Sequence, residues 1–77
     1  MSMLPAFKAV LEEGLSREQH KKITEDLRAL PGVLGAAFKK ASQRNPQNEV
    51  WVTYMHNPQV QRQAEAIPGV KTTRPLM

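Results

Sequence analysis

The chain has 77 residues, enough for one domain with one core, and it contains no cysteine. It therefore has no disulfide, no thiolate metal site and no cysteine nucleophile. Its net charge of +4, from 11 basic and 7 acidic residues, favours an acidic partner, either a protein surface or nucleic acid. We see no signal peptide and no apolar run long enough to cross a bilayer, and we expect a cytoplasmic protein without membrane contact.

The first third of the chain predicts a strand followed by a helix. Apolar and polar residues alternate over residues 6–12, which places three apolar side chains on one face of a strand: Phe7, Ala9 and Leu11. A helix is expected over residues 17–30, because Ser16 and Gln19 fit the S-x-x-Q capping box at its start. The apolar stripe of this helix consists of Ile23, Leu27 and Leu30. The following Pro31-Gly32 pair ends the helix.

The middle of the chain predicts two strands joined by a polar hairpin loop. Residues 33–40 form the second strand and residues 49–55, rich in β-branched and aromatic residues, form the third. The segment 42–48 is the loop between them. Alternation in the second strand separates two sets of side chains, one of Leu34, Ala36 and Phe38 and the other of Gly35, Ala37 and Lys39. In the third strand it separates Val50, Val52 and Tyr54 from Trp51, Thr53 and Met55.

The last third predicts a helix and a fourth strand. Asn57 is expected to cap the second helix, with Pro58 in its first turn and an apolar stripe of Val60, Ala64 and Ile67. Residues 70–74 form the fourth strand, which Pro75 ends or confines to a sheet edge. The helix-end sequence Ala29-Leu30-Pro31-Gly32-Val33 has an echo in Ala66-Ile67-Pro68-Gly69-Val70.

The resulting β-α-β-β-α-β order predicts an α+β fold of the ferredoxin-like kind. This fold has a four-stranded antiparallel sheet with two helices on one face. We expect residues 1–77 to form one such domain, with flexible ends at residues 1–5 and 75–77. The predicted core consists of Leu11, Ile23, Leu27, Leu30, Phe38, Val52, Tyr54 and Ile67.

Two stretches, KKITEDLRALPGV (residues 21–33) and EVWVTYMHNP (residues 49–58), resemble the heavy-metal-associated (HMA) domain of copper chaperones and metal-pumping ATPases. The resemblance runs from Gln19 to Pro58, about half of the chain, and implies the same ferredoxin-like fold. That family binds soft metal ions through a C-x-x-C motif at the start of its first helix. Here the two positions are Ser16 and Gln19, neither of which is a soft ligand, and this departure argues against metal carriage.

Other residues give no sign of metal or catalytic chemistry. His20 and His56 are the only histidines, and a metal site that used them with Met3 or Met55 would lack ligands at helical spacing. The acidic residues fit a solvated surface, since nothing marks a pocket around them. The sequence has no nucleophile elbow and no glycine-rich phosphate loop. We therefore predict no enzyme activity, no metal and no cofactor.

Trp51 is the most informative residue for function. Alternation places it on the sheet face away from the helices, with Gly35, Ala37 and Lys39 as expected neighbours. There it either shields the sheet or anchors a partner, a role for which tryptophan is enriched. The predicted partner-binding residues are Trp51, Lys39, Lys40, Thr53, Met55 and Arg44.

Three functions remain open from the sequence. The leading one is a small protein-binding module that docks on a larger protein and regulates or inhibits it, through the open face or by strand addition. The second is RNA or other nucleic-acid binding through basic residues beside an exposed aromatic, as in RNA-recognition domains, although the G-F-x-F type of strand signature is missing. The third is a residual metal-binding role.

Overall fold

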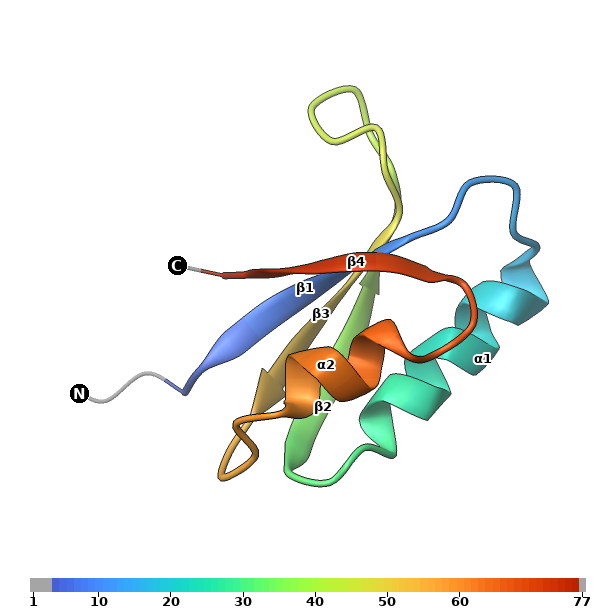
Figure 1. The fold of residues 1–77 in the computed structure, drawn as a ribbon. Coiled ribbons are helices and arrows are strands. Elements are labelled where there is room, and N and C mark those ends of the chain that lie inside the picture. The colour runs from blue at the N-terminus through green and yellow to red at the C-terminus, as the bar shows by residue number, and fades with distance from the viewer. Residues whose placement is uncertain (1–3, 77) are drawn as a thin grey trace.

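A computed structural model describes residues 4–76, which form one sheet and two helices. The elements, in chain order, are β1 (Ala6–Leu11), α1 (Arg17–Arg28), β2 (Val33–Lys39), β3 (Glu49–Tyr54), α2 (Val60–Glu65) and β4 (Val70–Pro75), as Figure 1 shows. The four strands lie in the order β2-β3-β1-β4, and all neighbours are antiparallel.

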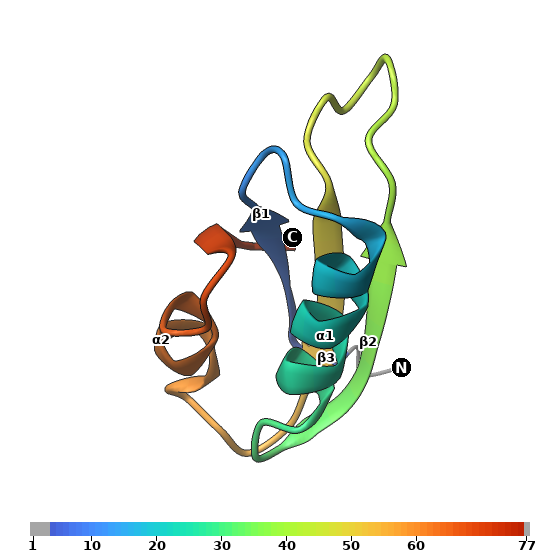
Figure 2. The same ribbon diagram turned by 90° about the vertical axis from the view of Figure 1, so that its right-hand side faces the viewer.

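Both helices lie on the same face of the sheet, α1 along β2 and α2 along β4 (Figures 1 and 2). The ferredoxin-like α+β fold predicted from the element order is therefore confirmed. Within residues 4–76, neither helix combines the length and the apolar character needed to cross a membrane.

Helix α1 begins at the predicted capping box. The Ser16 hydroxyl accepts a hydrogen bond from the Gln19 backbone N–H over 3.2 Å, and the Gln19 side chain accepts one from the Ser16 N–H over 2.8 Å. The helix ends at Arg28, two residues before the predicted end, and Ala29 forms its C-cap. Gly32 then turns the chain with a φ of 81°. A side chain at this glycine would collide with the Met55 carbonyl oxygen, so the turn requires glycine.

The core lies between the sheet and the helices. Its largest fully buried side chains are Phe7, Leu11, Leu27, Val50, Val52 and Val60. Four of the predicted core residues are buried, namely Leu11, Ile23, Leu27 and Val52. Another three pack against this core while remaining partly exposed, namely Leu30, Tyr54 and Ile67. The predicted core therefore holds except at Phe38.

Two apolar residues of β2 differ from the prediction. Phe38 is paired with Val50 and lies on the helix side of the sheet, but it keeps 37% of its surface exposed at the outer edge, where it stacks on His20. Leu34 is 57% exposed because the register between β2 and β3 shifts from Val33 to Gly35. Since the shift removes Leu34 from the alternation, its predicted grouping with Ala36 and Phe38 is wrong.

Helix α2 is shorter than expected and starts later. It begins at Val60 after the N-cap Gln59, which makes no side-chain capping bond. Asn57, the predicted cap, instead accepts from the Gln59 backbone N–H over 3.2 Å and donates to the Pro31 carbonyl over 2.7 Å. Asn57 therefore ties the turn before α2 to the turn after α1.

Both edges of the sheet carry a bond from a helix side chain. At β2, the Arg28 guanidinium donates to the Ala36 carbonyl over 3.0 Å. At β4, the Thr73 backbone N–H donates to the Glu65 carboxylate over 3.3 Å. These bonds occupy backbone groups that edge strands otherwise leave free.

The chain ends were predicted to be flexible. Residues 1–3 and 77 lie outside the described part of the chain, and so does Met3, which was considered as a metal ligand. Pro75 is the last residue of β4, and the Leu76 N–H donates to the Ala6 carbonyl over 3.1 Å.

Candidate partner-binding face

Within residues 4–76, one face of the sheet carries no helix. Paired residues on neighbouring strands point to the same side, and successive residues alternate. Because Phe7, Val50 and Val52 are buried on the helix side, the intervening positions point to the helix-free side. Ala6, Val10, Glu49 and Thr72 are among these positions. We reserve the name open face for the seven positions around Trp51, which are Lys8, Gly35, Ala37, Lys39, Trp51, Thr53 and Arg74.

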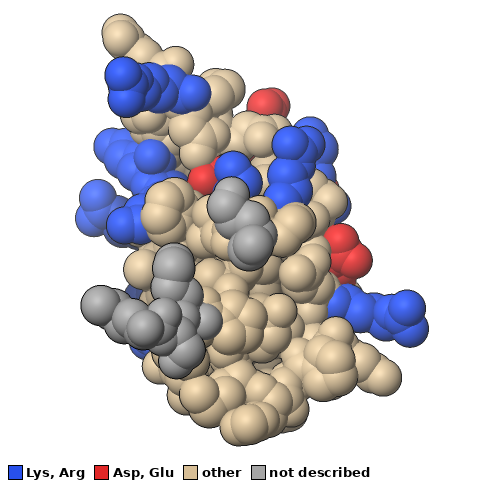
Figure 3. Space-filling model, turned by 90° about the vertical axis from the view of Figure 1, so that its left-hand side faces the viewer, with Lys and Arg blue, Asp and Glu red and all other residues tan. Residues whose placement is uncertain are grey.

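Figure 3 views this side of the molecule. Lys and Arg side chains gather mainly along its upper and lateral margins, together with fewer acidic ones, and a broad area without charged side chains lies below them. This side therefore combines an uncharged area with a mainly basic margin.

Trp51 lies at the centre of the open face, as predicted, and keeps 43% of its surface exposed. It is paired with Ala37 on β2 and Lys8 on β1. Small residues of β2 leave a shallow hollow next to the indole, which is bordered by Gly35, Ala37 and Leu76. An apolar side chain of a partner could enter this hollow and contact the ring.

Two contacts fix the Trp51 side chain. Its Nε1–H donates to Oε1 of Glu49 over 3.2 Å, and the Lys39 ammonium lies 5.1 Å from the ring centroid. The second contact is a cation–π interaction. Because the ring is already held in place, a partner that binds it loses little conformational entropy.

Glu49 is the residue that the sequence analysis missed. It is only 2% exposed, although it shares the side of the sheet on which Trp51 lies. Its second carboxylate oxygen lies 3.4 Å from Nζ of Lys8. The sequence does indicate that Glu49 lies on the same side of the sheet as Trp51, because the two residues are two positions apart in one strand. What the sequence does not show is the loop that covers it.

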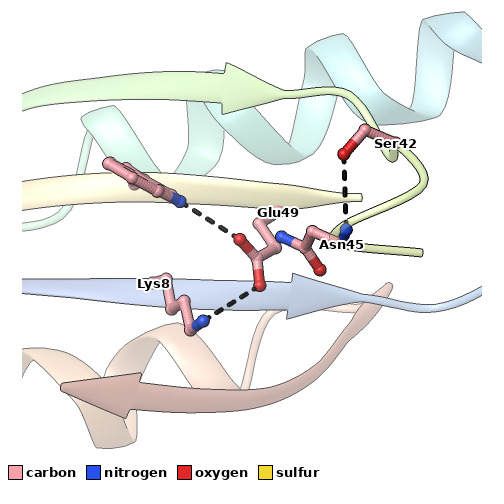
Figure 4. A network of polar contacts seen from close by, with 5 residues as sticks. Lys8, Ser42, Asn45 and Glu49 are labelled. Carbon is pink, nitrogen blue, oxygen red and sulfur yellow. Dashed lines mark hydrogen bonds and ion pairs between the residues drawn. The ribbon is translucent and has the colours of Figure 1, made fainter. Parts of the chain in front are cut away.

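The loop between β2 and β3 folds back onto Glu49. The Ser42 hydroxyl accepts from the Asn45 backbone N–H over 3.3 Å, and the Asn45 side chain lies beside the carboxylate (Figure 4). The Asn48 side chain closes the loop by accepting from the Ala41 N–H over 2.8 Å.

The surroundings of Glu49 keep it ionised. Burial alone would raise the pKa of the carboxyl group. Hydrogen bonds from Trp51, Asn45 and Lys8, together with the positive charge of Lys8, favour the carboxylate and hold its pKa below the ordinary value of 4.5. At neutral pH, Glu49 is therefore a charged acceptor for the indole N–H.

The predicted partner-binding residues divide between two surfaces. Trp51, Thr53 and Lys39 lie on the open face, and Met55 follows directly after β3 with 37% of its surface exposed. Arg44 is exposed in the loop after β2. Lys40, by contrast, borders a groove on the opposite side of β2, next to α1. The predicted cluster of Lys39, Lys40 and Arg44 is therefore split by the plane of the sheet.

Ser16 and Gln19, neither of which is a soft metal ligand, are engaged in the α1 capping box. His20 stacks on Phe38 at a centroid distance of 4.9 Å, and His56 lies in the turn after β3 with a φ of 59°. Among residues 4–76, no three His, Cys, Asp or Glu side chains are grouped closely enough to hold a metal ion.

Comparisons of the chain with models of protein families, with curated proteins and with solved structures found no match.

Proposed function

We propose that this chain is a small protein-binding module that acts in the cytoplasm, docks on a larger protein and regulates or inhibits it without catalysing a reaction. The observation that carries this proposal is the half-exposed Trp51 at the centre of a sheet face without helices. A large aromatic side chain, held in place and bordered by small residues, has the properties of an interface hot spot.

Two further features support docking through the open face. The hollow beside Trp51 is bordered mainly by small or apolar side chains, which need no polar partner when they are covered. Lys39 and Arg74 give the open face a positive rim, whereas the charge of Lys8 is paired with that of Glu49. Such a rim steers an acidic protein toward the face and mainly affects the association rate.

A second candidate is nucleic-acid binding through the same face, favoured by Lys39 over the Trp51 ring. That arrangement combines a cation with a stacking surface. Trp51 is the one aromatic residue among those of the open face, which disfavours this alternative, because sheets that bind RNA stack two or three bases on several aromatic side chains. We therefore place protein binding first. The resemblance to HMA domains supports a shared scaffold, and we propose no metal role from it.

The proposal is tested by affinity capture with the wild-type chain and two variants, Trp51→Ala and Leu34→Ala. Leu34 is a suitable control because it is an exposed apolar residue of the same sheet that belongs neither to the open face nor to the groove next to α1. After a captured protein has been purified, Trp51→Ala should weaken its binding by about 2 kcal/mol, roughly 30-fold in Kd, while Leu34→Ala has little effect. Thermal melts confirm that both variants fold.

Equal capture by the wild-type chain and Trp51→Ala would contradict the proposal. The ratio of absorbance at 260 and 280 nm distinguishes the alternative, since bound nucleic acid raises it. If nucleic acid is the ligand, replacing Lys39 should reduce the slope of log affinity against log salt by about one.

A further inference from the structure

A basic groove runs between α1 and β2, on the opposite side of β2 from Trp51. It has a volume of about 720 Å³, within the range of ligand sites in proteins. We call it the α1–β2 groove, and the residues that characterise it are Arg17, His20, Lys21, Arg28, Phe38 and Lys40. Figure 2 shows the two elements side by side.

The charge of the groove is strongly one-sided. Arg17, Lys21, Arg28 and Lys40 each carry a fixed positive charge at its border, whereas Glu25 is the one carboxylate there. Among residues 4–76, none of these four cations lies within ion-pair distance of a carboxylate. The neighbouring Lys22, outside the groove, is paired with Asp26 over 3.0 Å. The groove therefore has positive charge left for an anionic ligand.

The cations of α1 are regularly spaced. Arg17, Lys21 and Arg28 share one helix face, because their separations of four and seven residues are close to whole numbers of turns. Four residues of helix span roughly 6 Å, and alternate residues of an extended strand are separated by roughly 6.7 Å. Arg17 and Lys21 can therefore meet successive side chains on one face of an extended peptide.

The outer edge of β2 forms one border of this groove. Along an antiparallel strand, the backbone N–H and C=O groups of alternate residues point to opposite edges. The Ala36 carbonyl accepts from Arg28 and therefore points away from β3. The backbone groups of Ala36 and Phe38 thus face the outer edge of the sheet. These backbone groups can pair with a further strand. Phe38, stacked on His20, adds an apolar surface at the same place.

We propose that the α1–β2 groove binds an extended acidic peptide segment, which adds to the sheet as a strand beside β2. Its backbone pairs with Ala36 and Phe38, and its alternate carboxylates face the cations of α1. When the peptide binds, one of its N–H groups replaces the Arg28 guanidinium at the Ala36 carbonyl. The released guanidinium then pairs with a carboxylate of the peptide. This site is independent of the proposed function, because it uses none of the residues of the open face.

Two other occupants fit the groove less well. A second copy of this chain paired through β2 would bring two basic grooves together. Nucleic acid would satisfy the charges, but it offers no amide backbone to pair with the strand edge. The combination of an edge strand without a neighbouring strand and positive charge therefore favours an acidic peptide.

The test measures fluorescence anisotropy of a labelled peptide of twelve alternating Glu and Val residues with the full chain. A Gln-Val peptide of the same length and a twelve-residue oligothymidine serve as comparison ligands. The double variant Arg17→Glu/Lys21→Glu reverses two charges in the groove. The matched control Arg62→Glu/Lys71→Glu makes the same change of net charge on α2 and β4, away from the groove.

We expect the Glu-Val peptide to bind at least tenfold more tightly than the Gln-Val peptide. The groove variant should weaken its binding at least tenfold, and the control variant should weaken it less than threefold. Hydrogen exchange should slow at the amides of Ala36 and Phe38 when the peptide is bound, because these amides join the new strand pair.

Several outcomes would overturn the proposal. Equal losses in the two double variants would show attraction to net charge alone, and unchanged exchange at Ala36 and Phe38 would exclude strand addition. Tighter binding of the oligothymidine than of the Glu-Val peptide would assign the groove to nucleic acid. No binding of the Glu-Val peptide up to roughly 1 mM would show that the groove is not a peptide site.

Discussion

The indole Nε1–H of Trp51 donates a hydrogen bond of 3.2 Å to Oε1 of Glu49, a carboxylate that also lies 3.4 Å from the Lys8 ammonium. A partly exposed aromatic ring is thus hydrogen-bonded through its N–H to a buried carboxylate. This relationship determines how the open face presents its largest side chain, and it can be tested without knowing the partner.

Removing the acceptor should loosen Trp51. In Glu49→Ala the indole N–H loses its protein partner, and we expect acrylamide to quench the single tryptophan more efficiently than in the wild-type chain. The free energy of unfolding should fall by about 1–3 kcal/mol, because charged hydrogen bonds are lost. Glu25→Ala, a change on the exposed surface of α1, is the control. An unchanged quenching constant in Glu49→Ala would show that the bond does not hold the ring.

The same carboxylate should make stability depend on pH. Its pKa is lowered in the folded chain, so its contribution is complete above the unfolded value of about 4.5 and is lost as the pH falls through the lower folded value. Urea unfolding should therefore show the wild-type chain losing its advantage over Glu49→Gln below about pH 4.5. A difference between the two chains that stays constant from pH 7 to pH 3 would contradict this assignment.

Truncation to alanine should lower the free energy of unfolding more at a buried position than at the sheet edge. Leu27→Ala should cost roughly 2–5 kcal/mol, because this fully buried leucine leaves a cavity between α1 and the sheet. Phe38→Ala should cost less than about 1.5 kcal/mol, since much of that ring already faces water. Urea denaturation of both variants measures the difference. Equal losses would mean that Phe38 belongs to the core after all.

Removing the N-cap of α1 should lower the stability of the chain, and a second capping residue should restore it. Ser16→Ala should lower the free energy of unfolding by roughly 0.5–2 kcal/mol, because it removes the acceptor for the Gln19 N–H. Ser16→Asp should restore most of this loss, since aspartate is an equally good N-cap. Chemical denaturation measures both changes. If the two variants lose the same amount, the effect does not come from the cap.

Metal ions should not stabilise the folded chain. Thermal melts with stoichiometric Cu(I) or Zn(II) should match those without metal, because the chain has no cysteine and because Ser16 and Gln19, which the resemblance to HMA domains aligns with their cysteines, are not soft ligands. A ligand that binds the native state must raise its stability. A double variant with cysteine at both positions, Ser16→Cys/Gln19→Cys, provides the positive control. A rise of several degrees in the wild-type chain would contradict this expectation.

The features that the sequence predicts well are those set by neighbouring residues. The element order, the capping box at Ser16 and the outward position of Trp51 follow from periodicity and local hydrogen bonding. Each of these depends on a few residues that are close in the chain. Local rules therefore suffice for the scaffold and for the central residue of the candidate face.

The features that escape prediction depend on how the loop and the sheet edges fold. Glu49 is buried because the loop after β2 folds over it, and Lys40 lies beside α1 because it follows Lys39 and therefore returns to the side of Phe38. Leu34 leaves the alternation through a shift in register between Val33 and Gly35. Phe38 stays partly exposed because it lies at the outer edge of the sheet, where it stacks on His20.

The side-chain bonds at the two edges of the sheet bear on how the protein behaves when it is concentrated. In an open-ended assembly, β2 of one chain would pair with β4 of the next. Each such contact would require breaking the bond of Arg28 to Ala36 and that of Thr73 to Glu65. A single strand that arrives at β2 breaks only the first of these. The edge bonds therefore disfavour fibre formation, while binding of a single peptide strand at β2 costs only one of them.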